Sequence, residues 1–333
     1  MAAAFVRRAA HDRLVGETSV AKAQEADEPG VSVPQTSLLM ATAAAGALIG
    51  VAIVLVWEPG WNGIQKGHAD SGPFVLWVAL IATQPMLWAV ALPSLVGTLL
   101  RHWRSRQRDS VWREVVPSAA GFVVLLVAFA VLPRRTHTLH TVPSDLIPHV
   151  SLRVAALTAL AGLVALVAAI SIWLIRGRAE VLAAGRTLTG AELRTYLRLR
   201  SDLERLLAYL GAVIGLAVLT TAALRRVVVQ EYGDEQFPPE VLILYGVALT
   251  LIVALVYLPT WATIERTGSL LRDGIAPLPE PASDQLEAQL RKRAALDDLL
   301  GLRVSASISF KAGVAILSPL LASLTSLLPN LGG

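Results

Sequence analysis

Long apolar segments without internal charge constrain this chain more than any other feature of its sequence. Six of them follow one another between residues 36 and 263. Each is close to the ~20 residues that a helix needs to cross the hydrocarbon of a bilayer. Inside lipid, backbone polar groups have to be satisfied within the segment, which favours helices. The segments are residues 36–57, 73–100, 115–132, 151–175, about 206–228 and 240–263. We therefore expect an all-α polytopic integral membrane protein with about six transmembrane helices.

The composition agrees with a membrane protein and narrows its chemistry. Hydrophobic residues make up 54% of the 333 residues and charged residues only 16%. In a typical soluble domain about a quarter of the residues are charged. The chain has no cysteine, which excludes disulfides, thiolate metal sites and cysteine nucleophiles. Basic residues are mostly arginine, and alanine and leucine are abundant. This usage indicates a bacterial protein.

A block of arginines sets the expected orientation in the membrane. It consists of Arg101, Arg104, Arg106, Arg108 and Arg113, between the second and third apolar segments. Residues 101–114 and 176–205 hold twelve Lys or Arg, whereas residues 58–72, 133–153 and 225–239 hold six. Basic loops stay on the cytoplasmic side. We therefore expect a multi-pass protein of the cell (inner) membrane with both the N and C termini in the cytoplasm.

The net charge of +4 predicts membrane lipids as partners, through their anionic headgroups. Aromatic residues do not alternate with the arginines, as they do on surfaces that stack nucleic-acid bases. We therefore expect no nucleic-acid partner.

The polar regions divide the chain further. Residues 1–34 are polar without periodicity and predict a flexible cytoplasmic N-terminal tail. Residues 35–274 form the six-helix transmembrane domain, with a cytoplasmic stalk around residues 176–206. In this stalk the fourth helix continues to Ala184, and Thr189 and Glu192 form a capping box for a helix that runs into the fifth segment. An amphipathic helix lying on the headgroups is the alternative.

The C-terminal region follows a Pro-rich linker over residues 275–283, which is stiff and extended. Residues 284–333 then predict a basic helix of about residues 285–300, ended by Gly301, and an apolar amphipathic helix. An apolar seam with alternating spacings of four and three runs along the apolar helix. It comprises Phe310, Val314, Leu317, Leu321, Leu324 and Leu328. The segment is an interfacial helix, a re-entrant segment, a seam that packs against copies of itself in a homo-oligomer, or a seventh crossing.

Small and polar residues mark special places inside the apolar segments. Gly46 and Gly50 form a GxxxG pattern in the first segment, and Gly211 and Gly215 form one in the fifth. This spacing lets helices approach closely, within one subunit or between subunits. Gln84 precedes Pro85 in the second segment. Its amide either lines a pore or braces the carbonyl that Pro85 frees.

Candidates for chemistry are few. His137, His140 and His149, together with Asp145, are weak zinc-ligand candidates in one loop. A solvated loop is the alternative. The sequence has no P-loop, HExxH, GxSxG or Rossmann pattern. We therefore expect no catalytic residue and no cofactor.

The absence of ionisable residues from the interiors of the six segments argues against coupled transport and proton pumping, because such proteins handle ions through these groups. We therefore expect a non-enzymatic membrane protein that acts as an oligomeric scaffold, sensor or effector through its cytoplasmic helices. An oligomeric channel or pore with a hydrophobic gate is the alternative. A lipid-handling enzyme is a further alternative.

Overall fold

The computed structural model describes residues 33–55, 72–104, 120, 150–185, 190–277 and 286–302. Within these residues the chain forms six α-helices, one short 3-10 helix and no β-strand. The helices are α2 (Val33–Leu55), α3 (Gly72–Arg104), α5 (Val150–Ala184), α6 (Gly190–Tyr232), η2 (Asp234–Gln236), α7 (Pro239–Ile275) and α8 (Leu286–Leu300). The chain divides into two units, Met1–Thr42 and Ala43–Gly333. The first contributes only the start of α2 to the described residues, and the second holds the other helices.

Four of the described helices are long and apolar enough to cross a membrane, namely α3, α5, α6 and α7. They coincide with the second, fourth, fifth and sixth segments predicted from the sequence. The apolar part of α2, Met40–Ile53, is shorter. The predicted third segment, residues 115–132, lies outside the described residues. The described part of the chain is thus an all-helical protein that is compatible with a multi-pass membrane location.

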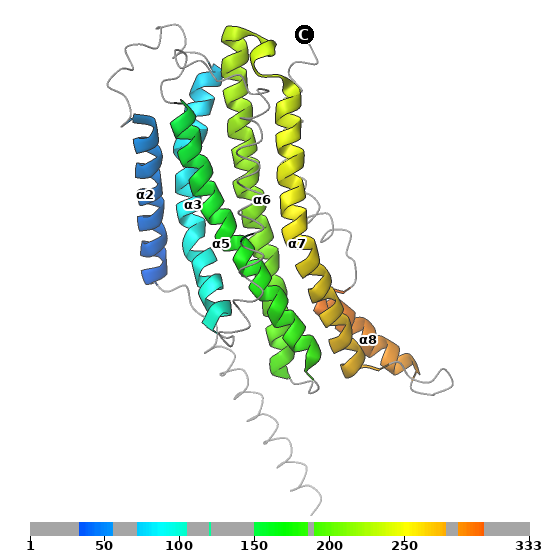
Figure 1. The fold of residues 1–333 in the computed structure, drawn as a ribbon. Coiled ribbons are helices and arrows are strands. Elements are labelled where there is room, and N and C mark those ends of the chain that lie inside the picture. Colours follow the sequence, from blue (N-terminus) through cyan, green and yellow to red (C-terminus); the bar gives the residue numbers. More distant parts are fainter. Residues whose placement is uncertain are drawn as a thin grey trace, which may run out of the picture. The chain divides into compact units, whose positions relative to one another are not determined.

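The four long helices lie side by side within the second unit (Figure 1). Two hydrogen bonds fix the direction of α7 against α5. The Thr260 hydroxyl donates to the Ile172 carbonyl at 3.5 Å, and the Thr267 hydroxyl donates to the Ala179 carbonyl at 3.2 Å. The two donors are seven residues apart on α7, and the two acceptors are seven residues apart in the same direction on α5. The helices α5 and α7 therefore run parallel. The carboxyl ends of both helices therefore lie at the same end of the bundle.

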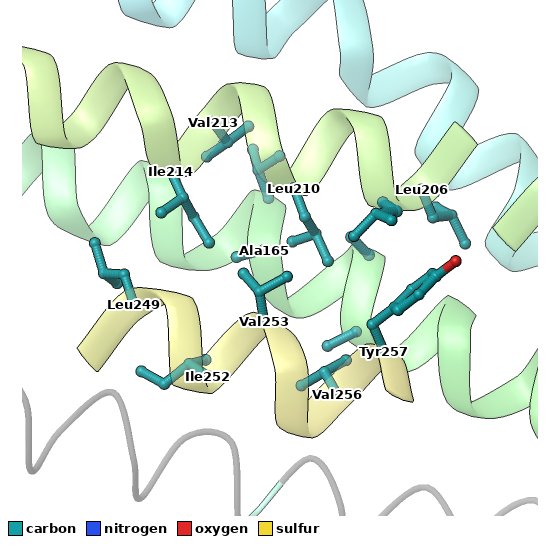
Figure 2. Packing of buried hydrophobic residues seen from close by; sticks show 14 of the residues in the cluster. Ala165, Leu206, Leu210, Val213, Ile214, Leu249, Ile252, Val253, Val256 and Tyr257 are labelled. Carbon is teal, nitrogen blue, oxygen red and sulfur yellow. The ribbon is translucent and has the colours of Figure 1, made fainter. Parts of the chain in front are cut away.

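One buried seam runs along residues 196–213 of α6. Its residues alternate at spacings of three and four, the pattern of a helix packed against neighbouring helices. They are Tyr196, Leu199, Leu203, Leu206, Leu210 and Val213, all buried. Figure 2 shows part of this packing, where Leu210 and Ile214 of α6 face Val253 of α7 near Ala165 of α5. Close packing of this kind holds helices together in lipid, where the hydrophobic effect contributes little.

The helices continue past their apolar segments at one end. The sequence predicted this for the fourth and fifth segments, and α5 indeed runs to Ala184 while α6 begins at Gly190 and is unbroken. The turn expected between them, with Thr189, lies outside the described residues. The sequence did not predict that α7 continues past residue 263 to Ile275. Ile264, Thr267 and Leu271 are buried there at spacings of three and four residues. Charged residues between them lower the hydropathy, so the continuation of the helix was not recognised from the sequence.

Helix α8 ends as the sequence predicted, at Gly301. The Leu302 N–H donates to the Asp297 carbonyl at 2.8 Å, and the Gly301 N–H donates to the Asp298 carbonyl at 3.1 Å. Gly301 has a φ of 64°, a left-handed conformation that glycine adopts without strain. These bonds form the Schellman motif that commonly stops a helix.

Gly46 and Gly50 lie against the backbone of α3. An ideal Cβ on Gly46 would be 2.5 Å from the Pro85 carbonyl oxygen, and one on Gly50 would overlap the carbonyl oxygen of Ala82. Gly46 lies against Pro85, and Gly50, later in α2, lies against Ala82, earlier in α3. The two helices are therefore antiparallel here. The other pair of the GxxxG pattern lies in α6, where Gly211 is buried.

This close approach predicts that Gly50→Ala destabilises the protein and Gly97→Ala does not. Gly97 is also in a helix, but a Cβ there meets nothing within 4 Å. The clash at Gly50 should lower the free energy of unfolding by about 1–3 kcal/mol. The alanine at position 97 should leave it unchanged or raise it by about 0.5–1 kcal/mol. Unfolding in mixed detergent micelles measures both variants, and equal stability of the two would contradict the packing of α2 on α3.

Candidate functional site

A cluster of charged and polar side chains joins three helices just beyond their apolar segments. Arg101 and His102 come from the end of α3, Arg178 from α5, and Asp202 from the early part of α6. We call these four side chains the polar junction. His102 is fully buried and Asp202 is 3% exposed. Burying such groups is costly unless they are hydrogen-bonded, so their partners decide what the junction can do.

Each polar group of the junction has a partner. His102 Nε2 lies 3.1 Å from Asp202 Oδ2, and Arg101 Nη1 lies 3.1 Å from the same oxygen. Arg178 Nη1 lies 3.0 Å from His102 Nδ1. A guanidinium group can only donate, so Nδ1 accepts from Arg178 and Nε2 carries the proton that is donated to Asp202. The imidazole is therefore neutral in this arrangement and links α5 to α6 through α3.

The electrostatic environment of the junction is positive. Arg198 and Arg205 lie about one helical turn on either side of Asp202 in α6. Arg198 and Arg101 are close enough to Arg178 for their charges to repel it, and Arg205 is close enough to attract Asp202. Arg101, Arg178 and Arg205 are thus close to the carboxylate of Asp202, and Arg198 is close to Arg178. This excess of positive charge makes the junction suited to an anion.

A second set of contacts fastens α8 to α7, and we call it the α8 latch. Arg272 of α7 pairs with Asp297 of α8 at 3.0 Å. Arg293 of α8 pairs with Asp273 and also donates to the Ala276 carbonyl at 3.1 Å. Because the pairs run in both directions between the helices, they fix the register of α8 on α7.

The last residue of α8 is held by α6. The carbonyl of Leu300 accepts hydrogen bonds from the Tyr196 hydroxyl at 3.3 Å and from Arg200 Nη1 at 2.5 Å. The Leu300 side chain is fully buried. Carbonyl groups at a helix C-terminus lack partners inside the helix and carry partial negative charge. Arg200 supplies both a donor and a compensating charge there.

Glycines allow these elements to approach. A Cβ on Gly268 of α7 would overlap the hydroxyl of Tyr196, and one on Gly301 would lie 2.5 Å from the Arg200 guanidinium carbon. The absence of a side chain at both positions leaves room for Tyr196 and Arg200 at the end of α8.

The structure places the predicted site residues as follows. Arg101 belongs to the polar junction, and Arg104 is exposed at the end of α3. The Gln84 amide is buried and donates to the Thr220 hydroxyl and, at 3.3 Å, to the Leu216 carbonyl of α6. Pro85 is also buried, beside Gly46. The remaining candidates lie outside the described residues: Arg106, Arg108, Arg113, His137, His140, His149, Phe310, Val314, Leu317, Leu321, Leu324 and Leu328. Among the described residues, no three His, Asp or Glu side chains gather as a metal site would require.

Sequence reasoning missed His102 and Asp202 as partners. His102 stands among arginines in the sequence, and this segment was interpreted only as a basic loop that sets the orientation in the membrane. Asp202 did carry a signal, since it occupies a buried position between Leu199 and Leu206 in the seam of α6. A carboxylate at such a position needs a partner from another helix, although its identity cannot be read from spacing.

No protein-family model matches the chain, and neither a curated protein nor a solved structure matches it.

The junction predicts that Asp202→Ala destabilises the protein more than Glu204→Ala. Removing Asp202 leaves the buried donor of His102 without its acceptor, which should cost about 1–3 kcal/mol. Glu204 pairs with Arg200 on the surface of the same helix, with half of its side chain exposed. Its loss should change stability by only about 0.3–0.5 kcal/mol. Thermal unfolding in detergent compares the two, and a larger effect at position 204 would contradict the role of the junction.

Proposed function

We propose that this chain is a non-enzymatic, multi-pass membrane protein that acts as an oligomeric scaffold or effector through helices that extend into the cytoplasm. It has six spans, with both termini in the cytoplasm of a bacterial cell. The cell membrane is its location.

The directions of the described helices support an even number of spans. The end of α3 and the later part of α5 meet at the polar junction, so α3 and α5 run parallel. Residues 105–149 therefore have to connect opposite ends of the bundle, as a third crossing at residues 115–132 would. Together with the antiparallel contact of α2 on α3, this gives the alternation that six spans require.

The main support for the proposal is the folded part of the chain that continues beyond the apolar segments, which we call the extension. Helices α5, α6 and α7 all continue at the same end, and α8 is bonded to both α6 and α7. Buried Tyr196, Leu199 and Leu300 give the extension an apolar core of its own. In water, such a core is stabilised by the hydrophobic effect. A protein that acted only within the lipid would not require this structure.

Polar groups within the apolar helices support a packed module more than a pore. The Gln84 amide is directed at α6, and the Thr260 hydroxyl bonds to α5. At the opposite end, buried Arg225 donates to the Phe237 carbonyl at 2.9 Å and pairs with Asp234 at 2.6 Å. These bonds hold the elements of one chain together. In a pore, some of these groups would face water or ions.

The latch gives the extension its proposed role. Because α8 is fastened to α6 and α7, the chain that follows Leu302 begins at a fixed place on the extension. The seam predicted over Phe310–Leu328 has the spacing of a self-packing helix. We propose that it joins copies of this chain, with the extension holding it in register.

Deleting residues 304–333 should therefore reduce the size of the oligomer. The matched control removes residues 2–31, a segment of the same length at the other end of the chain, and should leave the size unchanged. Native mass spectrometry of the detergent-solubilised proteins measures the mass of each assembly. A monomeric full-length chain, or an oligomer that survives the C-terminal deletion, would contradict the proposal.

The topology predicts where single cysteines can be labelled, since the native chain has none. Glu235, Arg194 and Lys292 are all exposed. A cysteine at position 235 should react with a membrane-impermeant maleimide added to spheroplasts. Cysteines at positions 194 and 292 should react only after the membrane is permeabilised. The reverse pattern would overturn the orientation, and labelling at all three positions without permeabilisation would overturn the membrane location.

A further inference from the structure

We propose that the polar junction and the two flanking arginines of α6 form a binding site for the phosphate-bearing headgroup of an anionic phospholipid. The residues of this site are Arg101, Arg178, Arg198 and Arg205, around the buried pair of His102 and Asp202. The inference rests on the proposed membrane location, and it adds a specific site and a ligand class to it.

The first support is the imbalance of charge. Arg178 is bonded to a neutral imidazole, so its own charge is not compensated by that contact. Arg198 and Arg205 are exposed and form none of the ion pairs recorded among the described residues. The nearest carboxylates along α5 and α6 are engaged elsewhere, since Glu180 pairs with Arg176 and Glu204 pairs with Arg200. Among the described residues, the site sets one carboxylate, that of Asp202, against four guanidinium groups, and an anion would lower their mutual repulsion.

The second support is the depth of the site. Arg101, Arg178 and Arg205 lie within one helical turn of the apolar segments that end at residues 100 and 175 and begin near residue 206, and Arg198 lies about two turns beyond. Trp103, one residue after the junction, packs against Leu174. Tryptophan is enriched at the level of lipid headgroups. The guanidinium groups of the site therefore lie where headgroup phosphates lie.

The third support is the geometry of the donors. Each guanidinium is a planar group with several N–H donors and matches the oxygens of a phosphate. Arg178 uses one nitrogen for His102, which holds the group in place and leaves further donors available. Arg101 is likewise held by Asp202, yet 46% of its side chain is exposed. The buried pair thus positions two arginines, while Arg198 and Arg205 contribute charge from the surface.

The test compares lipid binding by the wild-type chain and by the double variant Arg198→Gln, Arg205→Gln. These substitutions remove two charges without removing a hydrogen bond of the junction. Short-chain phosphatidylglycerol is titrated into the detergent-solubilised protein and bound lipid is counted by native mass spectrometry, with phosphatidylcholine as the zwitterionic reference. A juxtamembrane arginine contributes on the order of tenfold or less to affinity for anionic lipid, so the double variant should bind phosphatidylglycerol roughly tenfold to thirtyfold more weakly. Binding of phosphatidylcholine should not change.

The matched control is the double variant Arg266→Gln, Lys292→Gln, which removes two exposed charges from α7 and α8, outside the junction, and should retain wild-type binding. If the Arg198→Gln, Arg205→Gln variant fails to fold, the single substitution Arg198→Gln takes its place, with a proportionally smaller loss. If the control variant fails to fold, Lys292→Gln alone takes its place. Equal binding of the two lipids by the wild-type chain would overturn the proposal, as would equal losses in the two double variants. Full competition by equimolar glycerol 1-phosphate would also overturn it, because the site would then prefer a soluble anion. Failure of these lipid tests would leave the labelling pattern and the oligomer size unaffected, so the two proposals can fail separately.

Discussion

The length of the helices relative to the thickness of a bilayer is the constraint on which the rest of this structure depends. Helix α6 has 43 residues and at 1.5 Å per residue is about 65 Å long. The hydrocarbon of a bilayer is only about 30 Å thick. A single helix of this length that crosses a bilayer must pass from lipid into water without a break. Helices α5 and α7 share the requirement, and so the bundle needs one packing scheme that works in both environments.

The seam of α6 meets this requirement, because its spacing is the same on both sides of residue 206. In the apolar part, Leu210 and Val213 are held by close packing, as helices in lipid are. In the extension, Tyr196, Leu199 and Leu203 fill the same positions, and there the exclusion of water adds to the stability. The polar junction lies close to residue 206, where we propose that α6 passes from lipid into water, and it fixes α3, α5 and α6 relative to one another there.

The sequence predicted those features that depend on local patterns. Apolar length identified four of the described helices, uninterrupted helical spacing predicted the continuation of α5 and α6, and Gly301 predicted the end of α8. Features that depend on contacts between distant residues were not predicted. His102 and Asp202 are one hundred residues apart, and no spacing rule connects them. The α8 latch depends on Arg272 and Asp297. The contact of α8 with α6 depends on the backbone carbonyl of Leu300, which no side chain in the sequence indicates. The continuation of α7 was missed because hydropathy falls at Glu265 and Arg266 although the buried positions continue.

We propose that α6 leaves the lipid at the level of the polar junction. Spin labels at Ser201 and Ala212, both exposed on α6, test it by collisional relaxation in reconstituted vesicles. The two sites are separated by about 16 Å along the helix axis. The label at position 201 should respond to a water-soluble nickel reagent, whereas the label at position 212 should respond to oxygen dissolved in the lipid. Preferential relaxation by oxygen at both sites, or by nickel at both, would contradict the claim.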